Sequence, residues 1–144
     1  MAGEKGDGLV ATDASKMLVD AFCSAGGKGP RYAEVGMCIG KREDDARKTA
    51  HKYFRWSLTG WSVQAELPDT KSFEAASRHV TSENVAEQIS CGPSVERHLA
   101  AVNKYVAAGF DHIVLTQVGP DQDYFLEVFQ KELAPALRHK KKLA

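Results

Sequence analysis

The sequence lacks the features that would place it in a membrane or on nucleic acid. Its longest uncharged stretch, residues 56–65, is broken by Ser, Thr, Gly and Gln and falls well short of the ~20 apolar residues that a membrane-spanning helix needs. The 19 Lys and Arg balance 19 Asp and Glu, so there is no excess positive charge to drive non-specific nucleic-acid binding. The first residues contain no apolar signal core, and we expect an unprocessed, cytoplasmic protein with neither membrane nor nucleic acid as partner.

Cysteine and histidine are too few and too scattered to indicate a metal site or a disulfide framework. The three cysteines, Cys23, Cys38 and Cys91, form no Cys-x-x-Cys pair, and their number is odd. We expect them to be inert, small hydrophobic side chains in a reducing compartment. The five histidines show no His-Glu-x-x-His motif and no other ligand spacing, so no metal is predicted.

Motifs for nucleotide binding and nucleophilic catalysis are also missing. There is no Gly-x-x-x-x-Gly-Lys-[Ser/Thr] loop and no Gly-x-Ser-x-Gly turn. The partial motif at residues 6–8 precedes an apolar run instead of following one, which favours a plain turn over a dinucleotide fingerprint. The catalytic residues therefore stay unknown at this level.

What the sequence does contain is an alternation of short apolar strands and amphipathic helices. Strands are expected at residues 8–12, 32–39 and 112–118, and Asp13 is the expected cap of the first intervening helix. Helical crossovers between such strands force parallel pairing. A complete (β/α) barrel has eight strands and about 250 residues. We therefore expect one α/β unit over residues 1–144, a partial TIM-type barrel of about three parallel strands with flanking helices and a helical insertion at residues 57–90.

Candidate binding residues follow from barrel geometry, because function gathers at the carboxyl ends of barrel strands. Thr12 follows the first expected strand and Gln117 lies near the end of the last, and each can form hydrogen bonds with a substrate or cofactor. The helix start at residues 92–94 could hold an anion, although an ordinary capped start is favoured. Trp56 and Trp61 could stack on a flat ring, but packing in a core or interface is the commoner role.

The order and spacing of several segments resemble one known family over nearly the whole chain. The segments are residues 5–12, 25–32, 44–51, 85–98, 105–112 and 117–122. They resemble the C-terminal half of luciferase-like oxidoreductases, and the later ones are similar to the branch that uses the deazaflavin coenzyme F420, in its glucose-6-phosphate-dehydrogenase-like group.

This resemblance implies a barrel enzyme that exchanges hydride between the deazaflavin and an organic small molecule, with F420 expected in preference to FMN. In such enzymes the first half of the barrel holds the deazaflavin and supplies acid–base residues, and nothing here corresponds to that half. Thr12 matches a threonine near the substrate phosphate of sugar-phosphate-specific members. Ser15 replaces one of their basic residues, which argues against glucose 6-phosphate as the substrate.

Three functions therefore stay open. The first is a fragment of an F420-dependent oxidoreductase, inactive alone, whose partner would be a complementing half-barrel chain. The second is a non-catalytic half-barrel that forms homo-oligomers to cover its exposed sheet. The third is a small α/β module that binds a phosphate ligand.

Overall fold

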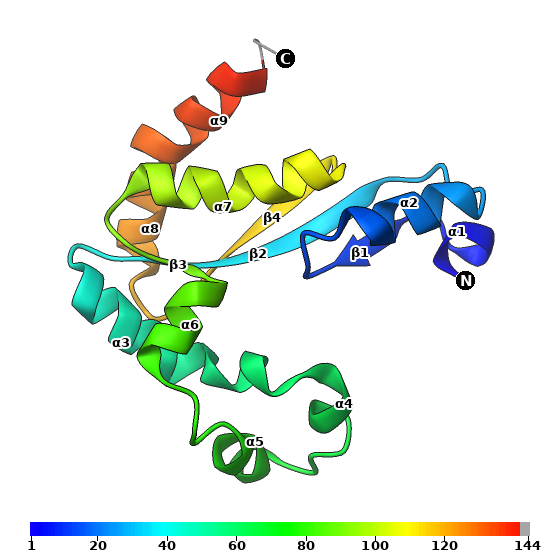
Figure 1. Cartoon of the computed structure of the whole chain (residues 1–144). Coiled ribbons are helices and arrows are strands. Elements are labelled where there is room, and N and C mark those ends of the chain that lie inside the picture. Colours follow the sequence, from blue (N-terminus) through cyan, green and yellow to red (C-terminus); the bar gives the residue numbers. More distant parts are fainter. Residues whose placement is uncertain (142–144) are drawn as a thin grey trace.

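The computed structural model describes residues 1–141 as a parallel four-stranded sheet with helices on both sides (Figure 1). The strands are β1 (Leu9–Ala11), β2 (Arg31–Ile39), β3 (Ser90–Gly92) and β4 (His112–Gln117). The first helices are α1 (Ala2–Lys5), α2 (Lys16–Ser24), α3 (Glu43–Phe54), the 3₁₀ helix η1 (Arg55–Thr59), α4 (Trp61–Gln64) and α5 (Thr70–Ala76). The later helices are α6 (Ser82–Gln88), α7 (Val95–Ala108), α8 (Gln122–Val128), the π-helical turn η2 (Phe129–Leu133) and α9 (Ala134–Lys141).

Strand β2 is the centre of the sheet, and its three partners all run parallel to it. β4 pairs with residues 32–37 of β2, β1 with residues 31–33 and β3 with residues 37–39. A strand residue has one neighbour on each edge, so β1 and β3 share the edge of β2 opposite β4. The predicted parallel α/β architecture is confirmed, with the three-residue β3 as an additional strand.

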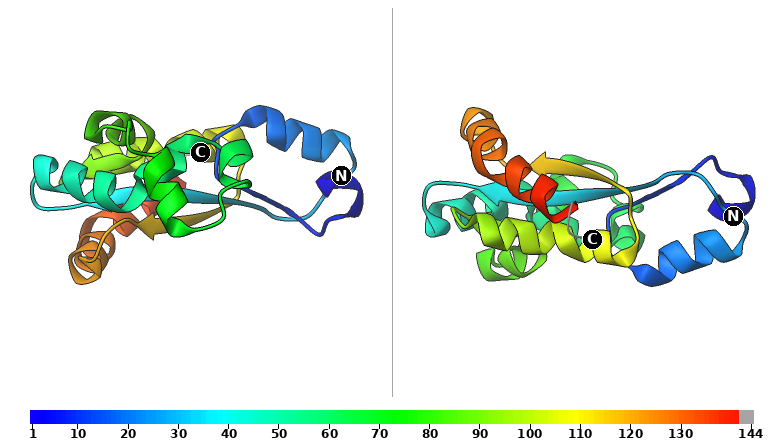
Figure 2. Two further views of the ribbon diagram at one scale, coloured as in Figure 1. Left: turned by 90° about the horizontal axis from the view of Figure 1, so that it is seen from below. Right: turned by 90° about the horizontal axis from the view of Figure 1, so that it is seen from above.

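One face of the sheet, which we call the outer face, has helices packed on it from the amino to the carboxyl end of β2. Alternate residues of β2, among them Val35 and Met37, point to this face and pack against α7, α8 and η2 through Val102 and Leu133. At the amino end of the sheet, Ala33 packs with residues of α2 and α7. Viewed from above, α7 lies over the strands (Figure 2), and α9 extends beyond it, away from the sheet (Figure 1). This is the arrangement that crossover helices give to a barrel sheet.

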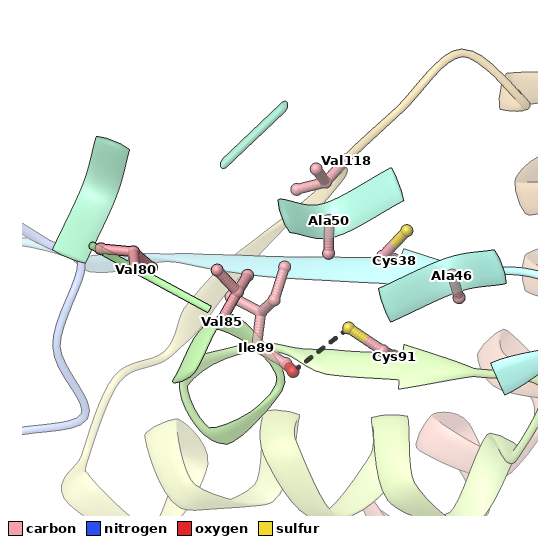
Figure 3. Packing of buried hydrophobic residues seen from close by; sticks show 8 residues of the cluster. All are labelled: Cys38, Ala46, Ala50, Val80, Val85, Ile89, Cys91 and Val118. Atoms are coloured by element: carbon pink, nitrogen blue, oxygen red, sulfur yellow. Dashed lines mark hydrogen bonds between the residues drawn. The ribbon is translucent and has the colours of Figure 1, made fainter. Parts of the chain in front are cut away.

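The opposite face, which we call the inner face, is covered only at the carboxyl end of the strands. There α3 and α6 pack on Cys38 and Cys91, and a core forms with Ala50, Val85 and Val118 (Figure 3). Toward the amino end, Val10 is 76% exposed and Val114 53% exposed. Parallel sheets are normally covered on both faces, so this end of the sheet is incomplete by the usual standard.

Helix boundaries follow the local sequence with one correction. Ser15, not Asp13, caps α2, because its hydroxyl accepts a hydrogen bond from the Leu18 amide. Gly109 ends α7 in the left-handed conformation, φ 101°, which favours glycine. No helix within residues 1–141 combines the length and apolar character required to cross a membrane.

Candidate functional site

The carboxyl ends of β2, β3 and β4 meet at one edge of the sheet. The Gly40 amide donates to Gly92 O at 3.3 Å, and the Val118 amide donates to Met37 O at 2.7 Å, so the strand ends are joined by backbone hydrogen bonds. Active sites of barrel enzymes form at this edge. A binding site is therefore expected at this edge.

Gln117 lies at this edge, but its side chain is occupied within the chain. Its Oε1 accepts from the Ile39 amide and its Nε2 donates to Ile39 O, both at 3.0 Å. The side-chain amide of Gln117 thus extends the pairing of β4 with β2 by one residue pair beyond the backbone hydrogen bonds of the two strands. Binding of a ligand by Gln117 stays a prediction, and it would require one of these bonds to be exchanged.

Thr12 lies away from the edge that holds Gln117. Ala11 pairs with Ala33 of β2, so Thr12 lies one residue beyond that level, whereas Gln117 pairs with Met37. The two predicted residues are therefore roughly 10 Å apart along the strand direction, on opposite edges of β2. Thr12 is exposed, and its carbonyl accepts a hydrogen bond from the Tyr105 hydroxyl at 2.9 Å. The structure does not bring the two predicted residues together.

The start of α7 is an ordinary capped helix end. The Ser94 hydroxyl accepts a hydrogen bond from the Arg97 amide and donates one to the Glu96 carboxylate. Glu43 lies beside this end, bridging Arg97 at 2.9 Å and Arg47, and hydrogen bonds from Arg97 and then Arg47 lower the pKa of the Glu43 carboxyl. With two carboxylates at this end, the geometry favours the capped start over an anion site.

The cysteines have different environments. Cys38 and Cys91 are paired residues of β2 and β3 and lie in the core under α3 (Figure 3). Burial raises the pKa of the Cys38 thiol to about 12 and that of Cys91 to about 11, so both stay protonated and unreactive at neutral pH. Cys23 is exposed, so the expectation of three inert hydrophobic side chains fits Cys38 and Cys91 but not the surroundings of Cys23.

The two tryptophans lie in the helical segment between β2 and β3. Trp56 contacts Phe54 and Phe73 edge-on, with ring centroids 5.5 and 6.4 Å apart, and its indole N–H donates to Tyr53 O. Trp61 is 75% exposed. Trp56 therefore packs against its neighbours in this segment although it is 41% exposed, and stacking of either tryptophan on a flat ring stays a prediction.

Polar residues that sequence patterns did not single out line the uncovered part of the inner face and the amino end. The Thr116 hydroxyl donates to Glu34 at 2.9 Å between neighbouring strands. At the amino end, Asp111 accepts from the Arg31 guanidinium at 2.9 Å and from His112 at 2.6 Å, beside a shallow cavity of about 280 Å³. Only the strand register could reveal the Glu34–Thr116 and Arg31–Asp111 pairs, because their members are 82 and 80 residues apart in sequence.

Comparison with known proteins identifies relatives of the chain. No family model matches it. The F420-dependent glucose-6-phosphate dehydrogenase of Mycobacterium avium is 36% identical over 150 residues, and that of Mycolicibacterium gilvum is 29% identical over 150 residues. This chain is a homologue of F420-dependent enzymes. Each match covers 95% of the chain but 44% of the relative, so the chain spans less than half the length of these curated relatives.

Solved structures of F420-dependent enzymes share the fold. An F420-dependent secondary alcohol dehydrogenase in complex with an F420–acetone adduct superposes with a TM-score of 0.73 at 17% identity, over 90% of this chain and 43% of that one. The F420-dependent tetrahydromethanopterin reductase of Methanopyrus kandleri gives 0.66 at 20% identity, over 94% and 46%. The predicted family resemblance and the partial TIM-type barrel are thereby confirmed.

Proposed function

We propose that this chain is a half-barrel of an F420-dependent, luciferase-like oxidoreductase that transfers hydride between the deazaflavin and an organic small molecule once the rest of the barrel is present. The observation that carries the proposal is a sheet with the fold of these enzymes whose inner face is uncovered at Val10 and Val114. Homology to F420-dependent dehydrogenases supplies the reaction class.

The chain's own residues do not make a deazaflavin site by themselves. The amide of Gln117 is bonded to Ile39, Thr12 lies on another part of the sheet, and no buried side-chain N or O within the described residues lacks a hydrogen-bond partner. Nothing in this half therefore offers an orphaned polar group to the cofactor. We assign cofactor binding and acid–base chemistry to the part of the relatives that this chain does not match, and we derive no catalytic step from the residues present.

Three further predictions belong to this proposal. The chain corresponds to the C-terminal half of the barrel, residues 57–90 are an insertion relative to a minimal barrel, and the protein is cytoplasmic. The structure adds that residues 57–90 contain the short helices α4, α5 and α6. A phosphate-binding module is the weaker alternative, because Glu43 and Glu96 lie at the start of α7.

The test is complementation. The chain is co-expressed with the part of the M. avium relative that the match does not cover, and F420 binding is followed by the polarisation of its fluorescence. We expect binding by the combined halves and little or none by either half alone. Hydride transfer is then assayed with glucose 6-phosphate and with a panel of simple alcohols. Equal F420 binding with and without this chain would contradict the proposal.

A further inference from the structure

The uncovered part of the inner face contains a carboxylate at its centre. In the strand register, Val10 of β1, Glu34 of β2 and Val114 and Thr116 of β4 all point to this face. Glu34 is exposed and accepts one hydrogen bond on the face, from the Thr116 hydroxyl at 2.9 Å. Any partner that covers this face removes that carboxylate from water.

Within the described residues, no cation balances Glu34. No Lys or Arg side chain forms an ion pair with it in this part of the chain. Two other titratable side chains in the register of this face, Tyr32 and His112, lie one step toward the amino end. His112 is bonded to Asp111 at 2.6 Å, and its ring lies 4.5 Å from that of Tyr32. Burying an ionised carboxylate with a single hydroxyl donor is costly, so a stable cover must bring its own positive charge.

From this charge pattern we infer that the surface fits a different half-barrel that places an Arg or Lys side chain over Glu34, and not a second copy of this chain. The inference rests on the proposed function, since it names the partner that completes the same barrel. Two copies closing a ring about an axis along the strands would place β2 opposite β2. They would bury two Glu34 carboxylates that face each other without a cation. The repulsion between these like charges disfavours a second copy of this chain as the partner.

The experiment compares Glu34→Gln with a matched control, Glu132→Gln, an exposed glutamate on η2 in the outer helical layer. Each variant and the wild type are titrated by calorimetry with the part of the M. avium relative that the match does not cover. We expect Glu34→Gln to weaken binding at least about tenfold and Glu132→Gln to leave it unchanged. Melting temperatures of the free variants check that both fold. We expect both to fold, because Glu34 and Glu132 are exposed.

Self-association is the second readout. By light scattering, the wild type alone is expected at the mass of one 15.7 kDa chain, and Glu34→Gln is expected to shift toward dimers because the like charges are gone. A wild-type dimer that cross-links through Val114→Cys would overturn the inference, as would Glu34→Gln binding the relative's half as tightly as wild type. If the halves together bind F420 while Glu34→Gln is neutral, this inference alone fails. If no complex forms, the proposed function fails with it.

Discussion

The two ends of β2 are built from the same strand but in different surroundings. At the carboxyl end, Met37, Cys38 and Ile39 are at most 2% exposed, because helices cover both faces. At the amino end, Tyr32 is 36% exposed and its neighbour Val10 76%, because only the outer face has helices. The comparison shows that one end of the sheet, the finished end, is covered on both faces, whereas the other, the unfinished end, leaves its inner face exposed.

The largest expected effect comes from a core substitution at the finished end. Met37→Ala removes a fully buried side chain and is expected to lower the free energy of unfolding by about 3 kcal/mol, the usual cost of such a cavity. Val114→Ala, on the uncovered face, is expected to cost less than about 0.5 kcal/mol. Urea denaturation of the two variants measures both values. Similar losses would show that the inner face is covered in solution.

A buried histidine makes the finished end sensitive to pH. His98 of α7 is fully buried and joins Ser90 at 2.7 Å and Gly92 at 2.9 Å, and burial lowers its pKa. A lowered pKa means that the unfolded state binds the proton more tightly. The contribution of neutral His98 to the free energy of unfolding is therefore fully present above the unfolded-state pKa near 6.5. It falls as the pH drops below that value, by at most about 1.4 kcal/mol per pH unit.

His98→Gln tests this link. At pH 7.5 we expect a loss of about 2 kcal/mol from the broken hydrogen bonds to β3, and the gap to wild type should narrow as the pH falls to 5. His79→Gln is the control, because His79 is exposed. Denaturation curves at several pH values give both quantities. A gap that stays constant with pH would mean that His98 is not the group that titrates.

The sequence predicted the elements better than the contacts between them. The apolar runs of β2 and β4 were visible because strands of parallel sheets are rich in Val, Ile and Leu. The apolar run of β4 also predicted cover on both faces, which is wrong, because Val114 is 53% exposed. The strand Ser90–Gly92 was not, since three small residues show no periodicity. Gln117 was chosen for its position at a strand end, but its bonds to Ile39 depend on the register of two strands 78 residues apart. Thr12 stays a predicted binding residue, but the sequence did not show its distance from Gln117, because the register of β1 on β2 sets its level on the sheet.

A smaller effect is expected where β4 leaves the sheet. Gln117→Leu removes two hydrogen bonds to the Ile39 backbone and is expected to cost about 1–2 kcal/mol, with faster hydrogen exchange at the Ile39 amide. Gln130→Leu, on an exposed part of η2, is the matched control and should change neither. If hydrogen exchange at the Ile39 amide is unchanged in Gln117→Leu, the two bonds do not form in solution. The Gln117 side chain of the wild type is then available to a ligand.

The smallest effect is expected at the unfinished end, where the exposed ion pair between Arg31 and Asp111 joins the start of β2 to the residue before β4. His112 first, and then Arg31, hold the pKa of the Asp111 carboxyl well below its usual range, so its contribution is complete above about pH 4 and is lost as the carboxyl protonates below that. Asp111 is 37% exposed, and solvent screening limits the cost of Asp111→Asn to about 1 kcal/mol. High salt should shrink that cost and leave the Met37→Ala value unchanged. If Asp111→Asn instead lowers the free energy of unfolding by about 3 kcal/mol independently of salt, the amino end of the sheet is as well packed as the carboxyl end.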